Sequence, residues 1–130
     1  KIILAGGTGT MGLILQAHFA EHGHEVVVLT RRPALRQHPR TRIVAWDART
    51  GGAWANELQH ADVLINLAGR SVDCRYTPAN KALILNSRVE ATRALGEAMT
   101  NCTAPPPLWI NMSSATVYRH AEDRPMDEIA

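Results

Sequence analysis

The sequence has few cysteines and no long hydrophobic run. Two cysteines, Cys74 and Cys102, in 130 residues are too few for a disulfide framework. The longest apolar stretch, residues 63–69, is less than half as long as a membrane span, and nothing resembles a signal peptide. With 45% hydrophobic and 20% charged residues, the composition is that of a folded globular domain. These observations predict a single cytoplasmic domain with free thiols and no membrane partner.

Acidic residues are absent between Val26 and Trp46, although the net charge of the whole chain is only +2. This segment carries five arginines: Arg31, Arg32, Arg36, Arg40 and Arg42. Without them the rest of the chain is net negative, so the positive charge is local. A nucleic-acid surface needs a longer basic stripe, and we therefore expect no nucleic-acid partner. The segment is either a solvated loop or a site for one small anionic group.

Short apolar runs alternate with helical patterns along the chain. Runs typical of strands buried on both faces occupy residues 1–5, 25–29, 42–46, 62–67 and 108–112. A helical pattern runs from Met11 until Gly23 ends it, and a short helix is expected over 53–60. Pro78 begins a long helix that extends to about Thr100. This alternation predicts an α/β fold with a doubly wound parallel sheet, the Rossmann fold.

Glycines separate the first predicted strand from the first helix, at Gly6, Gly9 and Gly12. In dinucleotide-binding loops the first glycine permits a tight turn, the second lets the backbone approach a pyrophosphate, and the third lets the helix pack on the strand. Free N–H groups and the helix dipole then face the phosphates. Thr10 and Met11, at the helix start, join the predicted cofactor-binding residues. The alternative is an ordinary glycine-rich turn that binds nothing.

The second predicted strand leads into Thr30, Arg31 and Arg32. In NAD-binding folds an acidic residue at this point hydrogen-bonds the adenosine ribose, and it would repel a 2′-phosphate. Thr30 can instead donate a hydrogen bond to that phosphate. Either arginine can pair with it through charge-assisted hydrogen bonds or stack on adenine. The cofactor predicted for the basic segment is therefore NADP(H) rather than NAD(H).

Three motifs together resemble the extended short-chain dehydrogenase/reductases. They are the glycine loop 6–12, Asn-Leu-Ala-Gly at 66–69 and Ser-Ser-Ala-Thr-Val-Tyr at 113–118. More narrowly, the chain is similar to the atypical branch of sugar-nucleotide-epimerase-like proteins. That narrower similarity rests on residues 30–33, 46–47, 65–69, 75–77 and 87–88 and on Thr92. The resemblance covers nearly the whole chain and agrees with the Rossmann fold.

The resemblance implies further cofactor-binding residues. The backbone of Leu67, Ala68 and Gly69 would approach the cofactor at the end of the fourth strand, where open α/β sheets bind ligands. Arg88, on the following long helix, would face the same crevice and reach the phosphates or a ribose. Asp47 matches a position near the adenine, and a role in capping its own loop is the alternative.

The resemblance also implies a catalytic residue, although the usual acid/base pair is missing. Ser114 falls on the catalytic serine or threonine, whose hydroxyl would hydrogen-bond the reacting carbonyl or carbinol. Ser113 and Thr116 are neighbours that could be confused with it. Typical members also use a Tyr-x-x-x-Lys pair. Here Tyr76 is followed by Lys81, one residue too far, and no lysine follows Tyr118.

Together these features predict an NADP(H)-dependent oxidoreductase or epimerase that transfers hydride at a carbinol or ketone of a sugar-like or nucleotide-linked substrate. The alternative is a non-catalytic NADPH-binding sensor or regulatory module. The expected partner is a small-molecule substrate, with a homodimer as a further option. His18 and His22 are one helical turn apart but lack a convincing third ligand, so no metal site is expected. We expect residues 1–130 to be an incomplete Rossmann domain, without its C-terminal substrate-binding region.

Overall fold

The computed structural model describes residues 1–33, 40–114, 118, 120–123 and 125–127. One parallel sheet contains β1 (Ile2–Ala5), β2 (Val26–Thr30), β3 (Thr41–Ala45), β4 (Val63–Asn66) and β5 (Leu108–Asn111). The strand order is β3-β2-β1-β4-β5, and all neighbouring pairs are parallel. Every residue of β1 and β2 is buried, which explains their uninterrupted apolar runs.

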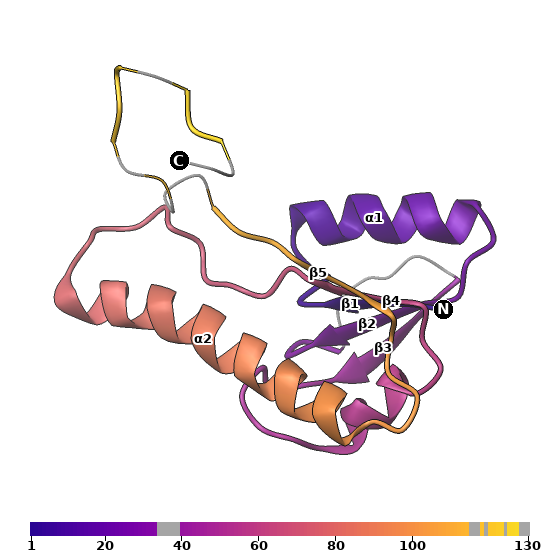
Figure 1. Ribbon diagram of the computed structural model, residues 1–130. Coiled ribbons are helices and arrows are strands. Elements are labelled where there is room, and N and C mark those ends of the chain that lie inside the picture. Colours follow the sequence, from indigo (N-terminus) through magenta and orange to yellow (C-terminus); the bar gives the residue numbers. More distant parts are fainter. Residues whose placement is uncertain (34–39, 115–117, 119, 124, 128–130) are drawn as a thin grey trace.

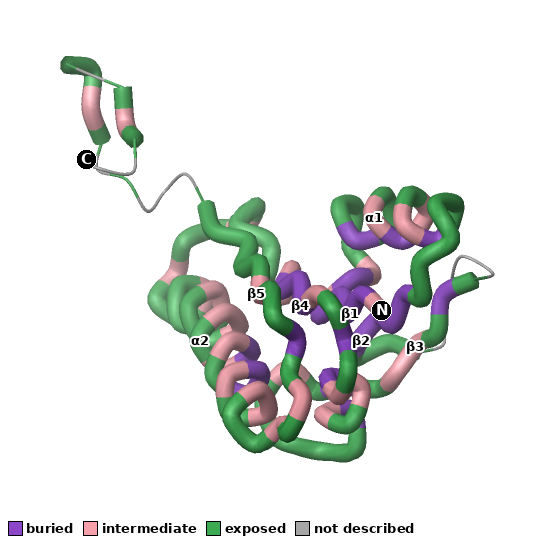
Figure 2. The backbone as a smooth tube through the Cα atoms, turned by 45° about the vertical axis from the view of Figure 1, so that its right-hand side comes forward, coloured by how far each residue is buried: buried purple, intermediate pink, exposed green. Residues whose placement is uncertain are grey.

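Helices cover the two faces of the sheet (Figure 1). On one face α1 (Thr10–Glu21) packs against a cluster that includes Leu4 and Val28. On the other face α2 (Pro78–Asn101) and the 3₁₀ helix η1 (Ala53–Leu58) share a cluster with Ile3 and Leu64. Figure 2 shows the buried residues concentrated in the strands, with the outer sides of both α-helices exposed. The fold is thus a three-layer Rossmann arrangement, as the sequence predicts.

Local sequence signals set the ends of both α-helices. Gly23 has a φ of 82°, which favours glycine, and its N–H donates to the Ala20 carbonyl. The N–H of His24 donates to the Phe19 carbonyl, and together these bonds form a Schellman motif that ends α1. At the start of α2, Thr77 Oγ1 accepts a hydrogen bond from the N–H of Asn80 at 3.2 Å.

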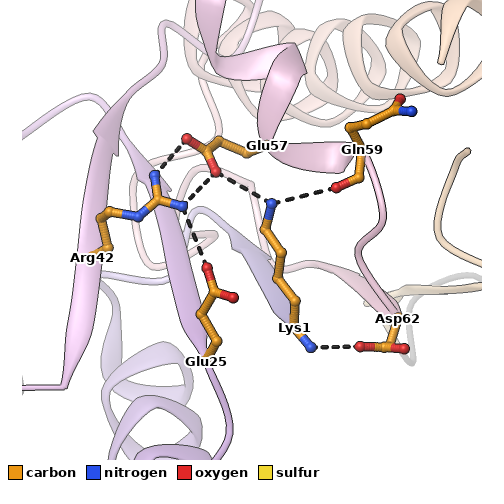
Figure 3. A network of polar contacts seen from close by, with 6 residues as sticks. All are labelled: Lys1, Glu25, Arg42, Glu57, Gln59 and Asp62. Carbon is orange, nitrogen blue, oxygen red and sulfur yellow. Dashed lines mark hydrogen bonds and ion pairs between the residues drawn. The ribbon is translucent and has the colours of Figure 1, made fainter. Parts of the chain in front are cut away.

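A network of charged side chains lies at the amino ends of the strands (Figure 3). Arg42 of β3 donates to both carboxylate oxygens of Glu57, and its contact with Glu25 is longer, at 3.5 Å. Lys1 Nζ lies 3.4 Å from Glu57 Oε2, and the main-chain nitrogen of Lys1 donates to Asp62. These contacts join Lys1, which precedes β1, to β3 and η1 at the edge of the sheet where the strands begin.

The predicted elements are confirmed, with ends that differ by at most two residues. The exception in type is the short helix expected over 53–60. It is a 3₁₀ helix over Ala53–Leu58, a geometry suited to a connection this short. Among the described residues, no helix is long and apolar enough to cross a membrane. Two apolar side chains of β5, Leu108 and Ile110, are 49% and 45% exposed.

Candidate functional site

A cleft of about 720 Å³ opens at the carboxyl ends of β1, β2, β3 and β4. Its walls come from the glycine loop, the segment after β2, the loop after β3, the segment after β4 and one side of α2. The lining residues include Gly6, Thr8, Gly9, Thr30, Arg31, Arg32, Trp46, Asp47, Arg49, Leu67, Ala68, Gly69 and Glu90. This is the edge of the sheet at which doubly wound folds bind their ligands.

The glycine loop owes its shape to two close backbone approaches. Gly6 has a φ of 76°, and a Cβ there would lie 2.8 Å from the Cα of Ala68. A Cβ on Gly12 would lie 2.1 Å from the carbonyl oxygen of Gly7. A Cβ on Gly9 would meet nothing within 4 Å, because Gly9 faces the open cleft. The third glycine therefore lets α1 approach the loop itself, rather than the strand expected from the motif.

Buried Gln16 of α1 hydrogen-bonds the backbone of this loop. Its Nε2 donates to the Gly7 carbonyl at 2.6 Å, and its side chain is fully enclosed by α1 and the loop. Gly9 is the N-cap of α1 without a side-chain cap, so the first N–H groups of the helix are left for water or a ligand. Thr10 and Met11 lie exposed in this first turn and are not among the residues that line the cleft. An anion could reach the loop through Gly9.

The end of β2 connects the glycine loop to the two arginines. Thr30 is buried, and its Oγ1 lies 3.3 Å from Thr8 Oγ1 of the glycine loop. The same oxygen accepts a hydrogen bond from the N–H of Arg32 at 3.1 Å. Arg31 and Arg32 are exposed and line the cleft. Thr30 therefore fixes the backbone from which both guanidinium groups extend.

Asp47 organises the loop after β3. Its carboxylate accepts hydrogen bonds from the N–H groups of Arg49 and Thr50 and from the Thr50 hydroxyl. The hydroxyl contact, followed by these backbone contacts, lowers the pKa of Asp47 below its usual value. Asp47 also lines the cleft, so the capping role and the position near a ligand coexist.

Trp46 and Trp54 pack against each other beside this loop. Both indoles are nearly enclosed, with ring centres 5.6 Å apart. Trp54 Nε1 donates to the Thr50 carbonyl at 3.0 Å and so supports the loop that Asp47 caps. Trp46 therefore gives the cleft an apolar surface beside this loop.

An ion pair crosses from this loop to α2. Arg49 Nε lies 2.8 Å from Glu90 Oε2, and both residues line the cleft. The contact with Glu90 raises the pKa of Arg49. Both carboxylates in the described lining, Asp47 and Glu90, are therefore already engaged within the protein. The remaining charges at the cleft are arginines, which favours an anionic ligand.

Asn66 organises the end of β4. Its Nδ2 donates to Asn111 Oδ1 of β5 at 2.7 Å and to Thr92 Oγ1 of α2 at 3.2 Å. Its Oδ1 accepts a hydrogen bond from the N–H of Ala68 at 3.1 Å. The amide is buried and holds two strands, a helix and the following turn together. This turn presents Leu67, Ala68 and Gly69 to the cleft.

Arg88 lies between this cleft and a second cavity. Its Nη1 donates to the carbonyl oxygens of Arg70 and Ile84, at 3.2 and 3.1 Å. A Cβ on Gly69 would lie 3.1 Å from Arg88 Cζ, so the guanidinium packs directly on that glycine. Arg88 lines the second cavity, whereas Gly69 lines the cleft. The structure thus places Arg88 at the wall of the second cavity, packed on the glycine that lines the cleft, and not among the residues that line the cleft itself.

The second cavity contains the predicted catalytic serine. It measures about 560 Å³, and its lining includes Ser113, Ser114, Asn111, Tyr76 and Lys81. Ala68 lines both cavities, which makes them neighbours. Tyr118 and Thr116 belong to the same predicted motif as Ser114, and Thr116 lies outside the described residues.

Several contributions to the site have no simple sequence signal. The Thr8 contact with Thr30, the Arg49–Glu90 pair and the Asn66 amide join residues that are far apart in the chain. Common polar residues in loops and on helix surfaces give no indication of such pairings. Among the described residues, no group of three or more His, Cys, Asp and Glu side chains is arranged to hold a metal ion.

The sheet, the glycine loop and the cleft at the strand ends define a dinucleotide-binding domain of the Rossmann type. Residues 2–130 match the family model described as the NAD dependent epimerase/dehydratase family. The chain belongs to this family, which confirms the resemblance to extended short-chain dehydrogenase/reductases.

Similar proteins carry related descriptions. Epimerase family protein YfhF of Bacillus subtilis is 35% identical over 91% of this chain and 39% of its own length. The human epimerase family protein SDR39U1, in a crystal structure with NADPH, has a TM-score of 0.77 and 28% identity, over 99% of this chain and 41% of that one. A structure of UDP-galactose 4-epimerase has a TM-score of 0.75 and 25% identity, over 93% of this chain and 40% of that one. The chain thus spans about two fifths of these relatives.

Proposed function

We propose that this chain is the NADP(H)-binding part of an oxidoreductase or epimerase that transfers hydride at a carbinol or ketone of a sugar-like or nucleotide-linked substrate. The observation that carries the proposal is the pairing of an open glycine loop with two exposed arginines at one cleft. The human relative whose structure contains NADPH supports the same choice of cofactor.

The residues at the cleft fit a dinucleotide that carries a 2′-phosphate. Gly9 leaves open space at the start of α1, where N–H groups would bind the pyrophosphate. Thr30 holds the backbone of Arg31 and Arg32, whose guanidinium groups would bind the 2′-phosphate. No carboxylate lies at this strand end to repel it. When bound, the nicotinamide would supply or accept the hydride.

The protein side of the reaction would centre on the second cavity. Ser114 lines this cavity beside Asn111, and its hydroxyl would hydrogen-bond the oxygen of the reacting carbonyl or carbinol. Asn66 holds the end of β5 in register with the end of β4, and so fixes the strand that leads to Ser114. Ala68 lines both cavities, so a cofactor in the cleft and a substrate in the second cavity would lie on either side of the turn that contains it.

Calorimetric titration of the complete protein with NADPH and with NADH tests the choice of cofactor. The double variant Arg31→Ala/Arg32→Ala should weaken NADPH binding by about 10- to 100-fold, or about 1.4–2.7 kcal/mol. This is less than two full charge-assisted bonds, because both arginines are exposed and water screens their charge. NADH binding should change little. Arg93→Ala, which removes an exposed arginine of α2 outside the cleft, is the matched control. Equal losses for both dinucleotides would contradict the 2′-phosphate assignment, and no binding of either would overturn the proposal.

Turnover separates the enzyme from a cofactor sensor, the second candidate. Complete protein should oxidise NADPH with a member of a panel of ketones and nucleotide sugars. Ser114→Ala should then lower kcat about 10²- to 10³-fold while NADPH affinity stays the same. NADPH binding without turnover on any panel member would favour the sensor.

A further inference from the structure

The buried face of α1 carries one polar side chain. The buried residues of this helix are Gly12, Gln16 and Ala20, which recur at every fourth position and therefore share one face. Gln16 is the largest of the three, and it is 1% exposed. Leucine or methionine would fill this place without bringing polar atoms into it, so packing alone does not explain a glutamine.

Only half of the Gln16 amide has a hydrogen-bond partner. Nε2 donates to the Gly7 carbonyl at 2.6 Å, and this carbonyl oxygen can only accept, which fixes the amide nitrogen as the atom that faces it. Oε1 is enclosed and has no partner among the described residues. An unpartnered buried acceptor costs about as much free energy as one hydrogen bond contributes. The gain at Nε2 is therefore offset at Oε1, and stability alone does not account for Gln16.

Gln16 and Gly12 together hold the Gly7 carbonyl against α1. The two residues are one helical turn apart, and the missing side chain of Gly12 makes room for the Gly7 oxygen. Gly7 is itself buried, and none of the backbone hydrogen bonds of the described loops ends on its carbonyl. Among the described residues, Gln16 is therefore the donor on which the direction of this carbonyl depends.

The direction of the Gly7 carbonyl also sets the direction of the next backbone donor. In a planar trans peptide the C=O of one residue and the N–H of the following residue point in opposite directions. Because the Gly7 carbonyl points to Gln16, the Thr8 N–H points away from it. Thr8 is half-buried and lines the cofactor cleft, whereas Gly7 does not. None of the backbone hydrogen bonds of the described loops uses the Thr8 N–H, so it is available to a ligand.

We propose that Gln16 is a positioning residue for the dinucleotide of the function proposed above, on which this inference rests. By holding the Gly7 carbonyl on α1, Gln16 keeps the Thr8 N–H, and the loop that leads on to Gly9, in the orientation that binds the phosphates. Without this bond the Gly7–Thr8 peptide would rotate until water reaches the carbonyl, which glycine permits. The donor at the cleft would then turn away from the ligand.

Calorimetric titration of the complete protein with NADPH and with NADH tests this proposal. Gln16→Met keeps the length of the side chain and removes both polar atoms. It should weaken both dinucleotides by the same factor, about tenfold or more, which is the contribution of one hydrogen bond to a charged group. The factor should be equal because the loop would bind the pyrophosphate that both dinucleotides contain. The unfolding temperature without ligand should change little, because the unpartnered Oε1 disappears together with the bond to Gly7.

Thr41→Val is the matched control. It also removes a buried polar atom without a partner among the described residues, at the start of β3 and so at the other edge of the sheet. This variant should leave both affinities unchanged. Gln16→Leu, with a different apolar shape, should repeat the result of Gln16→Met.

The proposal is overturned if the Gln16 variants bind both dinucleotides normally, including the case in which they only unfold at a lower temperature. It is also overturned if only NADPH binding weakens, since the effect would then arise at the 2′-phosphate. Failure of the unmodified protein to bind either dinucleotide would instead refute the proposed function.

Discussion

Asn66 and Asn111 join the carboxyl ends of β4 and β5 through their side chains, with Asn66 Nδ2 donating to Asn111 Oδ1 at 2.7 Å. Asn66 is at the last position of β4 and Asn111 at the last position of β5, and the two are paired in the sheet. Because Asn66 also contacts Thr92 and the Ala68 N–H, one buried amide connects the turn of the cofactor cleft with the floor of the second cavity.

Replacing Asn66 should therefore cost more than an average polar substitution. Asn66→Ala would remove a buried amide and three hydrogen bonds, and would leave the Asn111 oxygen and the Ala68 N–H partly buried without this partner. We expect a loss of about 1–2 kcal/mol in unfolding free energy. Urea denaturation of the complete protein measures this. Asn101→Ala, at the exposed end of α2, should change stability by less than about 0.5 kcal/mol. If Asn66→Ala also changed stability by less than about 0.5 kcal/mol, the Asn66 amide would not be what holds β4, β5, α2 and the following turn together.

Two substitutions in the glycine loop should affect protein stability and dinucleotide binding differently. Gly12→Ala gains up to about 1 kcal/mol of helix propensity, but its methyl group would lie 2.1 Å from a backbone oxygen of Gly7. The Gly7 backbone would have to move to make room, which costs more free energy than the helix propensity gains. We therefore expect a net loss of about 1–3 kcal/mol in unfolding free energy, together with weaker dinucleotide binding.

Gly9→Ala is the counterpart, since its methyl group meets nothing within 4 Å. This variant should unfold at the same temperature as the unmodified protein and still bind NADPH more weakly, because the methyl group projects where the ligand would approach. Thermal unfolding and calorimetry on both variants provide the comparison. Normal NADPH binding by Gly9→Ala would place the pyrophosphate elsewhere.

The network at the opposite end of the sheet predicts an acid-sensitive contribution to stability. Glu57 accepts two hydrogen bonds from Arg42, and this contact lowers the pKa of Glu57, with Lys1 adding to the effect. A carboxyl whose pKa is lower in the folded state stabilises that state above its unfolded pKa. The contribution is lost as the pH falls through the folded pKa, that is, at pH values below the usual glutamate range.

Glu57→Gln should accordingly flatten the fall in unfolding temperature between neutral pH and about pH 3. At neutral pH the variant should be less stable by about 0.5 kcal/mol, because Arg42 is half exposed and such pairs are screened. Calorimetric melts across that pH range give both numbers. An unchanged pH profile would indicate that other carboxylates account for the acid sensitivity.

Backbone-level features could be predicted from the sequence because they follow from patterns of neighbouring residues. The buried runs of β1 and β2, the glycine spacing and the proline at the start of α2 each act within a few residues. The exposed arginines after Thr30 were identifiable for the same reason, since the absence of acidic residues around them is a local property.

Side-chain partnerships across the fold could not be predicted in this way. The Arg49–Glu90 pair spans 41 positions, and the Asn66–Asn111 bond spans 45. Each depends on the register of strands and on the direction in which a helix presents its side chains. Asp47 is an intermediate case, because its capping bonds are local although its place beside the cleft is not.

The contact between Gly69 and Arg88 lies at the boundary between the cleft and the second cavity. A methyl group at position 69 would lie 3.1 Å from the guanidinium carbon, so the end of the Arg88 side chain would have to shift by a few tenths of an ångström. Even Gly69→Ala would therefore change the shape of the cleft and of the second cavity together. Under the proposed function, a substitution that adapts this boundary to another substrate would therefore also change the surface offered to the nicotinamide end of the dinucleotide.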